Sequence, residues 1–130
     1  MLYIYVGLAG AVGALARYGL GLLVDSFETS PFPVATLFIN LIGSFLLGWL
    51  THRFLQAGKP SPQIVTIVGT GMIGSFTTFS TFSVETIQLV ENDHALLAVA
   101  YVFLSITLGL WSSWFGYRIG TKTSTRGDVL

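Results

Sequence analysis

The segment GSFTTFSTF, Gly74 to Phe82, carries three phenylalanines among serines and threonines, within a stretch otherwise apolar enough to cross a membrane. Glycine costs a helix about 1 kcal/mol relative to alanine, and serine and threonine are also weak helix formers. A break at membrane depth requires its freed backbone groups to be buried in protein or to line a wet cavity, and broken helices often build ion sites. The segment therefore predicts a broken helix and an ion site.

Two aromatic rings of this segment are expected on one side of the helix that follows the break. Phe79 and Phe82 are three residues apart and share a face, with the hydroxyls of Ser80 and Thr81 beside it. Alternatively, the phenylalanines face lipid and the hydroxyls bond back to their own helix. The gathering of so many such residues in one segment favours the ion site.

Polar residues also recur at helical spacing in two other apolar segments, four or seven residues apart. The two stripes are Thr36, Asn40 and Ser44, and Tyr101, Ser105 and Ser112. They either line a path or hold helices together, since hydrogen bonds between membrane helices contribute about 0.6 kcal/mol each. Asn40 is the strongest candidate for the path, because a buried amide without a partner costs a few kcal/mol.

Intramembrane charges are few, and Glu85 and Arg17 are the candidates for function among them. Glu85 lies four residues after Thr81 and on the same face, which suggests the mouth of a pathway. Arg17 lies about a turn and a half from the end of its segment, where it either anchors the helix at the headgroups or serves the pathway.

The composition is that of an integral membrane protein. Of 130 residues, 52% are hydrophobic and 9% charged, with a mean hydropathy of +0.74, whereas soluble proteins average about 25% charged residues. A bilayer core needs roughly 20 apolar residues per helix. Four segments meet that need: Leu2–Val24, Val34–Phe54, Ile64–Val90 and Ala95–Tyr117. We therefore expect an all-α membrane protein with four transmembrane helices over residues 1–120, the third broken, and a polar, frayed tail over 121–130.

Several other functions find no support in the sequence. Six basic and six acidic side chains cancel, so no field attracts nucleic acid. The absence of cysteine excludes disulfides and thiolate chemistry. His52 and His94 stand apart without metal-ligand spacing, and no catalytic motif is present, so we do not expect an enzyme. No Lys or Arg precedes residue 17, so the first apolar segment is expected to remain as a membrane helix.

Glycines crowd two of the segments at short spacing, including Gly7, Gly10 and Gly13 in the first and Gly69, Gly71 and Gly74 in the third. Small residues let helix backbones approach closely in lipid, which predicts tight packing or oligomerisation. Glycine as tolerated filler is the alternative, because it is common in membrane helices.

The motifs GLAGAVGALARYG, NLIGSFLLG and GMIGSFTTFSTF together resemble the Fluc (also called CrcB) fluoride channels of bacteria, over nearly the whole chain to Gly120. The resemblance implies an antiparallel dimer in the bacterial cell membrane, with two narrow fluoride pathways, one structural sodium ion and passive fluoride export. Phe79 and Phe82 match the aromatic pair that approaches fluoride, and Asn40 matches the pathway asparagine. Gly74 and Thr77 match the positions whose backbone carbonyls hold sodium. The residues that resemble the polar track are Ser80, Thr81, Thr36, Tyr101, Ser105 and Ser112.

Two other classes of membrane protein fit a chain of this size: a small dual-topology multidrug transporter and a non-conducting structural subunit. The transporter would need a carboxylate in its first helix, and Leu2–Val24 has none.

Charge bias adds an expectation about orientation. Lys and Arg bias of short loops sets orientation, and here it favours both termini in the cytoplasm. The partner of this chain is then either a second copy or an oppositely oriented homologue.

Overall fold

The computed structural model describes residues 1–57 and 60–127, and over these residues every regular element is a helix, without strands. The elements in order are α1 (Leu2–Asp25), α2 (Val34–Ala57), α3 (Pro62–Val65), the π-helix η1 (Thr66–Ile73), α4 (Gly74–Phe76), α5 (Ser80–Glu91) and α6 (Ala95–Gly127).

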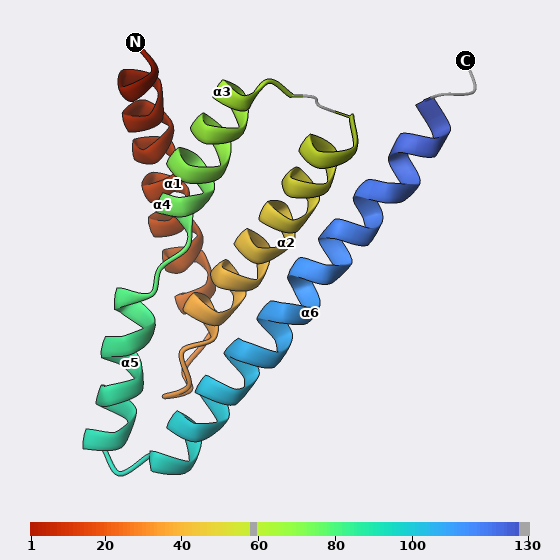
Figure 1. The fold of residues 1–130 in the computed structure, drawn as a ribbon. Helices are drawn as coiled ribbons and strands as arrows, with labels where there is room; N and C mark the ends of the chain where they lie inside the picture. The colour runs from red at the N-terminus through yellow and green to blue at the C-terminus, as the bar shows by residue number, and fades with distance from the viewer. Residues whose placement is uncertain (58–59, 128–130) are drawn as a thin grey trace.

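Four helical spans are long and apolar enough to cross a membrane, as the sequence predicted. They cover Leu2–Asp25, Val34–Gln56, Pro62–Glu91 and Ala95–Thr121. The predicted and observed bounds differ most at the last end, where Tyr117 was expected and Thr121 is found. The N-terminus, α3 and the C-terminal ends of α2 and α6 lie at one end of the bundle, whereas the α1–α2 loop and the α5–α6 turn lie at the other (Figure 1).

Helix α6 extends beyond the predicted membrane region. Its backbone is helical to Gly127, so residues 121–127 of the expected frayed tail continue the helix. Residues 128–130 lie outside the described part of the chain.

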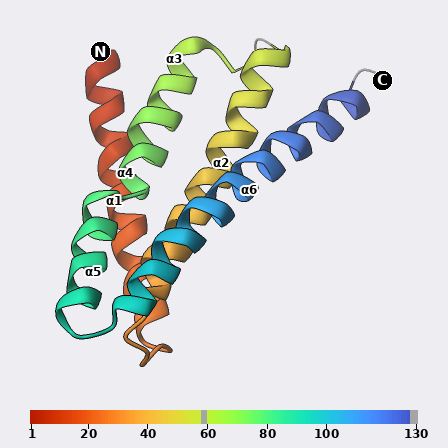
Figure 2. The ribbon, with the colours of Figure 1, turned by 60° about the horizontal axis from the view of Figure 1, so that its bottom comes forward.

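Helices α2 and α6 run side by side from the lower to the upper end of the bundle in both ribbon views (Figures 1 and 2). Glycine makes this close approach possible. A Cβ at Gly48 would lie closer than 3.0 Å to the backbone carbonyl of Ser113, and a Cβ at Gly116 would lie equally close to that of Phe45. The two backbones therefore touch directly, as expected for helices that pack through small residues in lipid.

Helix α1 packs against the third span, along η1 and α4. Gly13 is its buried residue, and a Cβ there would meet the backbone of Met72. Of the glycines that the sequence singled out in the first and third segments, Gly10, Gly13 and Gly71 lie at this contact, whereas nothing lies within 4 Å of a Cβ at Gly7.

Few side chains of the chain are buried by the chain itself. Tyr101 and His52 are the largest fully buried ones, at 0% and 1% exposure. Leu96, Trp111 and many other large apolar side chains are exposed, which suits a surface covered by lipid or by another subunit.

His52 differs from the solitary residue near a helix end that the sequence suggested. Its ring meets Tyr117 edge-on at 4.6 Å, and Gly120 leaves room for it. It therefore serves the packing of α2 against α6.

Candidate functional site

The third span contains a non-helical segment, Thr77–Phe79, between α4 and α5. Thr77 is extended, with a ψ of 159°, so its carbonyl leaves the helical direction. Hydroxyl groups bond the backbone on both sides of the break: Thr77 Oγ1 donates to the Ile73 carbonyl at 3.1 Å, and Thr78 Oγ1 accepts the N–H of Thr81 at 3.1 Å. Serine and threonine at these places favour such local bonds over a continuous helix.

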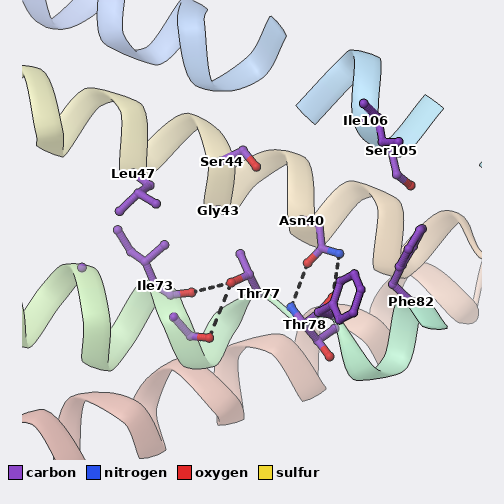
Figure 3. Close-up of a pocket in the computed structure, with 13 residues that line it drawn as sticks. Asn40, Gly43, Ser44, Leu47, Ile73, Thr77, Thr78, Phe82, Ser105 and Ile106 are labelled. Atoms are coloured by element: carbon purple, nitrogen blue, oxygen red, sulfur yellow. Dashed lines mark hydrogen bonds between the residues drawn. The ribbon is translucent and has the colours of Figure 1, made fainter. Parts of the chain in front are cut away.

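Asn40 of α2 holds this segment from the side. Its Nδ2 donates to the Thr78 carbonyl at 2.9 Å, and its Oδ1 accepts the Thr78 N–H at 2.9 Å (Figure 3). Both backbone polar groups of Thr78 are thus paired by one amide. A side chain with one donor and one acceptor side by side is required, which only asparagine or glutamine supplies.

A cavity of about 400 Å³ lies next to the segment, between α2, the third span and α6. Figure 3 shows Asn40 and Thr78 facing each other beside Phe82, with Ser105 on the neighbouring α6. The residues that line it are Asn40, Gly43, Ser44, Leu47, Gly69, Ile73, Gly74, Thr77, Thr78, Phe79, Phe82, Ser105 and Ile106. Polar groups of three spans therefore meet at one cavity.

The two phenylalanines lie together at this cavity. Their ring centroids are 5.8 Å apart, and Phe82 also packs on Tyr101 at 5.0 Å. Phe79 is 79% exposed, whereas Phe82 is half-buried. The outer ring is thus free to meet whatever covers the cavity, and the inner ring is fixed by α6.

Glu85 joins three spans. Thr36 Oγ1 of α2 donates to its Oε1 at 2.8 Å, and the Tyr101 hydroxyl of α6 donates to its Oε2 at 2.9 Å. Thr36 and Tyr101 are both buried. Two residues that the sequence assigned to a polar track therefore converge on the carboxylate that it placed at the mouth.

A second cavity, of about 370 Å³, lies between α1, α2 and α5. Its lining includes Arg17, Thr36, Thr81 and Glu85, and it shares Thr78 with the first cavity. Thr78 thus separates one cavity that holds the aromatic pair from another that holds the ionisable residues.

The remaining predicted site residues lie as follows. Ser80 is exposed, and its hydroxyl lies 3.3 Å from that of Thr78. Ser112 lies apart from both cavities, and its Oγ donates to the Leu41 carbonyl at 2.7 Å, so it joins α6 to α2 as the helix-holding alternative expected.

The sequence reasoning assigned no role to Thr78 or to Gly43. Thr78 could have been found as a threonine shortly before a helix start, because a hydroxyl there can accept a free backbone N–H of the first turn. Gly43 had no such signal, because the side chain that it accommodates comes from another span.

Four apolar spans around a clamped, polar, non-helical segment define a multi-pass membrane protein with a polar site at membrane depth. The family model described as "CrcB-like protein, Camphor Resistance (CrcB)" matches residues 4–117. The chain therefore belongs to the CrcB family.

Relatives match over almost their whole length. The "Fluoride-specific ion channel FluC 1" of Bacillus cereus (strain ATCC 10987 / NRS 248) is 52% identical over 134 residues, covering 100% of this chain and 98% of its own. A protein of the same name from Bacillus anthracis is 49% identical, with 100% and 98% covered. "Fluoride-specific ion channel FluC 2" of Geobacillus kaustophilus (strain HTA426) is 49% identical, with 98% of each chain covered.

Proposed function

We propose that this chain is the subunit of a fluoride-selective channel that lets fluoride leave the cell passively. One observation carries the proposal: Asn40 clamps a non-helical segment that sets Phe79 and Phe82 at a polar cavity within an apolar span. Relatives about 50% identical over the full chain bear the name of fluoride-specific ion channels, which supports the same function. The gradient, not a coupled reaction, drives export, and the cell is protected when undissociated acid leaks inward.

The chemistry of the cavity suits fluoride. Fluoride is small and strongly hydrated, so a narrow path must replace its water with donors, and hydroxyls and the Asn40 amide supply them. One Nδ2 hydrogen of Asn40 is engaged with Thr78, which leaves the second for an ion. The ring edges of Phe79 and Phe82 carry the positive end of the aromatic quadrupole and meet an anion without the strong hold of a cation. Weak contacts allow the ion to leave, as conduction requires.

The path runs from the aromatic pair toward Glu85. Thr78 lies between the two cavities, and the hydroxyls of Ser80 and Thr81 lie near its own. Thr36 and Tyr101 follow at Glu85, while Ser105 stays at the first cavity. Ser112 is left as a contact between helices. In this proposal the second cavity, which Arg17 and Glu85 line, is the vestibule at the mouth of the path.

A structural sodium ion fits the backbone at the break. Gly74 and Thr77 both line the first cavity, and the extended Thr77 directs its carbonyl away from the helical ladder. Carbonyl oxygens freed in this way are suitable ligands for a hard cation. The ion would supply positive charge that holds the third spans of two subunits together, with each subunit contributing its own pair of carbonyls.

The assembly proposed is an antiparallel dimer with two fluoride paths. The exposed ring of Phe79 at the first cavity supports this assembly, because a second subunit would cover the ring and close the site. Either a second copy or an oppositely oriented homologue is the partner.

Purified protein in liposomes tests the function directly. A fluoride electrode and a chloride electrode follow efflux, with and without a proton gradient. We expect fluoride flux, no chloride flux and no dependence on the proton gradient. Flux that follows the proton gradient would indicate a coupled multidrug-type transporter, and no flux of either ion would indicate a structural subunit.

A further inference from the structure

The non-helical segment touches α2 at two points, one helical turn apart. Asn40 pairs both backbone groups of Thr78. At Gly43, the methyl Cγ2 of Thr77 fills the space in which any other residue would carry its Cβ, and a Cβ built there would lie closer than 3.0 Å to this methyl. The Phe76 ring lies 3.6 Å from the same position. Gly43 therefore forms a socket for the side chain of Thr77 (Figure 3).

The Thr77 side chain has little freedom to leave this socket. Its Oγ1 donates to the Ile73 carbonyl at 3.1 Å and lies 3.5 Å from the Gly74 carbonyl. These contacts fix the rotamer, and the rotamer directs the methyl to Gly43. The backbone is tied as well, because the Thr77 N–H donates to Ile73 at 3.0 Å and Asn40 holds the next residue.

We propose that Gly43 is a positioning residue of the channel: its lack of a side chain sets how closely Thr77–Phe79 lies against α2. The inference rests on the proposed function. A Cβ at residue 43 would push the Thr77 methyl, and with it the backbone, away from α2. Functional groups must be held within about 0.5 Å of their working geometry. The carbonyl of Thr77 and the ring of Phe79 would then lose the positions that sodium and fluoride require.

One pair of substitutions tests this contact atom for atom. Gly43→Ala adds a methyl on α2, and Thr77→Ser removes the opposing methyl while keeping the hydroxyl and its bonds. The double variant moves one methyl from residue 77 to residue 43 at constant volume, which is the kind of core change that proteins tolerate best. Gly19→Ala is the matched control, because nothing lies within 4 Å of a Cβ at Gly19.

The experiment measures fluoride efflux from liposomes and thermal unfolding in detergent for the wild type, both single variants, the double variant and the control. We expect Gly43→Ala to lower efflux by about tenfold. Overpacking by one methyl changes the equilibrium between the working and the displaced position of Thr77–Phe79 by roughly this factor. Adding Thr77→Ser should restore efflux to the level of Thr77→Ser alone, and the unfolding temperatures should show the same rescue. A general loss of packing would not be rescued by one methyl at residue 77.

If the wild type conducts fluoride, any of three results overturns the inference. These are normal efflux of Gly43→Ala, a double variant as slow as Gly43→Ala, or changes in unfolding temperature of the two single variants that simply add in the double variant. If the wild type shows no fluoride efflux, the proposed function is wrong, and the result says nothing against the contact at Gly43. The unfolding series still reports the contact in that case, so the two failures are distinguishable.

Discussion

At the residue scale, the site combines groups that the sequence could indicate with contacts that it could not. The types and spacing of Phe79, Phe82 and Asn40 pointed to an ion path, and these residues share one cavity. The partner of Asn40 was not predictable, because Thr78 lies 38 residues away and offers only its backbone. The same holds for Glu85, whose partners come from two other spans. Spacing reveals which residues share a face, whereas packing decides what that face meets.

The aromatic pair gives the first prediction. Phe79→Ile and Phe82→Ile fill similar volume but lack the electropositive ring edge, so each should slow fluoride efflux by about tenfold, which corresponds to roughly 1.4 kcal/mol. Phe82→Ile should also lower the unfolding temperature more, because its ring packs on Tyr101. Efflux from liposomes and size-exclusion profiles in detergent check both effects. Wild-type efflux in both variants would remove the aromatic assignment.

The clamp gives the second prediction. Asn40→Ala leaves the N–H and C=O of Thr78 without their partner, and each unpaired buried group costs about 1–3 kcal/mol. Both thermal stability and fluoride efflux should therefore fall. Asn92→Ala is the matched control, since that amide bonds only the Gln88 carbonyl on an exposed helix end. Equal unfolding temperatures for the two variants would show that the clamp contributes nothing.

At the scale of elements, the four spans are confirmed because their physics is local. A segment in lipid must satisfy its own backbone, so each long apolar run has to be a helix. The order in which the helices pack was not predicted. Gly48 and Gly116 permit a close contact because α2 and α6 lie side by side, and residue spacing within one segment does not show which helix a small residue meets.

This crossing gives the third prediction. Gly116→Ala places a methyl against the Phe45 carbonyl, and overpacking of this kind costs about 1–3 kcal/mol. Gly109→Ala lies on the same helix with nothing within 4 Å of the new Cβ, and alanine is the better helix former by about 1 kcal/mol. We expect a lower unfolding temperature for the first and an equal or higher one for the second. The reverse order would contradict the observed packing.

The break itself gives the fourth prediction. If the carbonyls of Gly74 and Thr77 hold sodium, replacing sodium by a large organic cation should lower the unfolding temperature. A ligand at a hundred times its Kd contributes about 2.7 kcal/mol. Thr77→Ser keeps the carbonyl and should keep the sodium dependence. An unfolding temperature that is indifferent to the cation would argue against the site.

At the scale of the whole molecule, the even number of spans brings the N-terminus, α3 and the C-terminal ends of α2 and α6 to one end of the bundle (Figure 1). Four of the six basic residues belong to the halves of α2 and α6 that reach that end: Arg53, Arg118, Lys122 and Arg126. Lys59 follows α2 in the sequence and lies outside the described residues. The opposite end carries Asp25 and Glu91, the last residues of α1 and α5, and Glu28 and Asp93 in the α1–α2 loop and the α5–α6 turn, and neither connection contains Lys or Arg. The two ends of the molecule thus differ strongly in the charges that set orientation.

The last prediction concerns this orientation. Because Lys and Arg in short loops direct insertion and acids contribute little, most copies should insert with both termini in the cytoplasm. Arg17 lies within the first span and does not offset five charges at one end. An antiparallel dimer then needs either an oppositely biased homologue in the same membrane or the minority orientation of this chain. C-terminal fusions to one reporter active only in the cytoplasm and another active only outside it measure the ratio. We expect a dominant cytoplasmic signal. Equal signals would show that the charge bias is overridden, and that a single chain then supplies both orientations of the dimer.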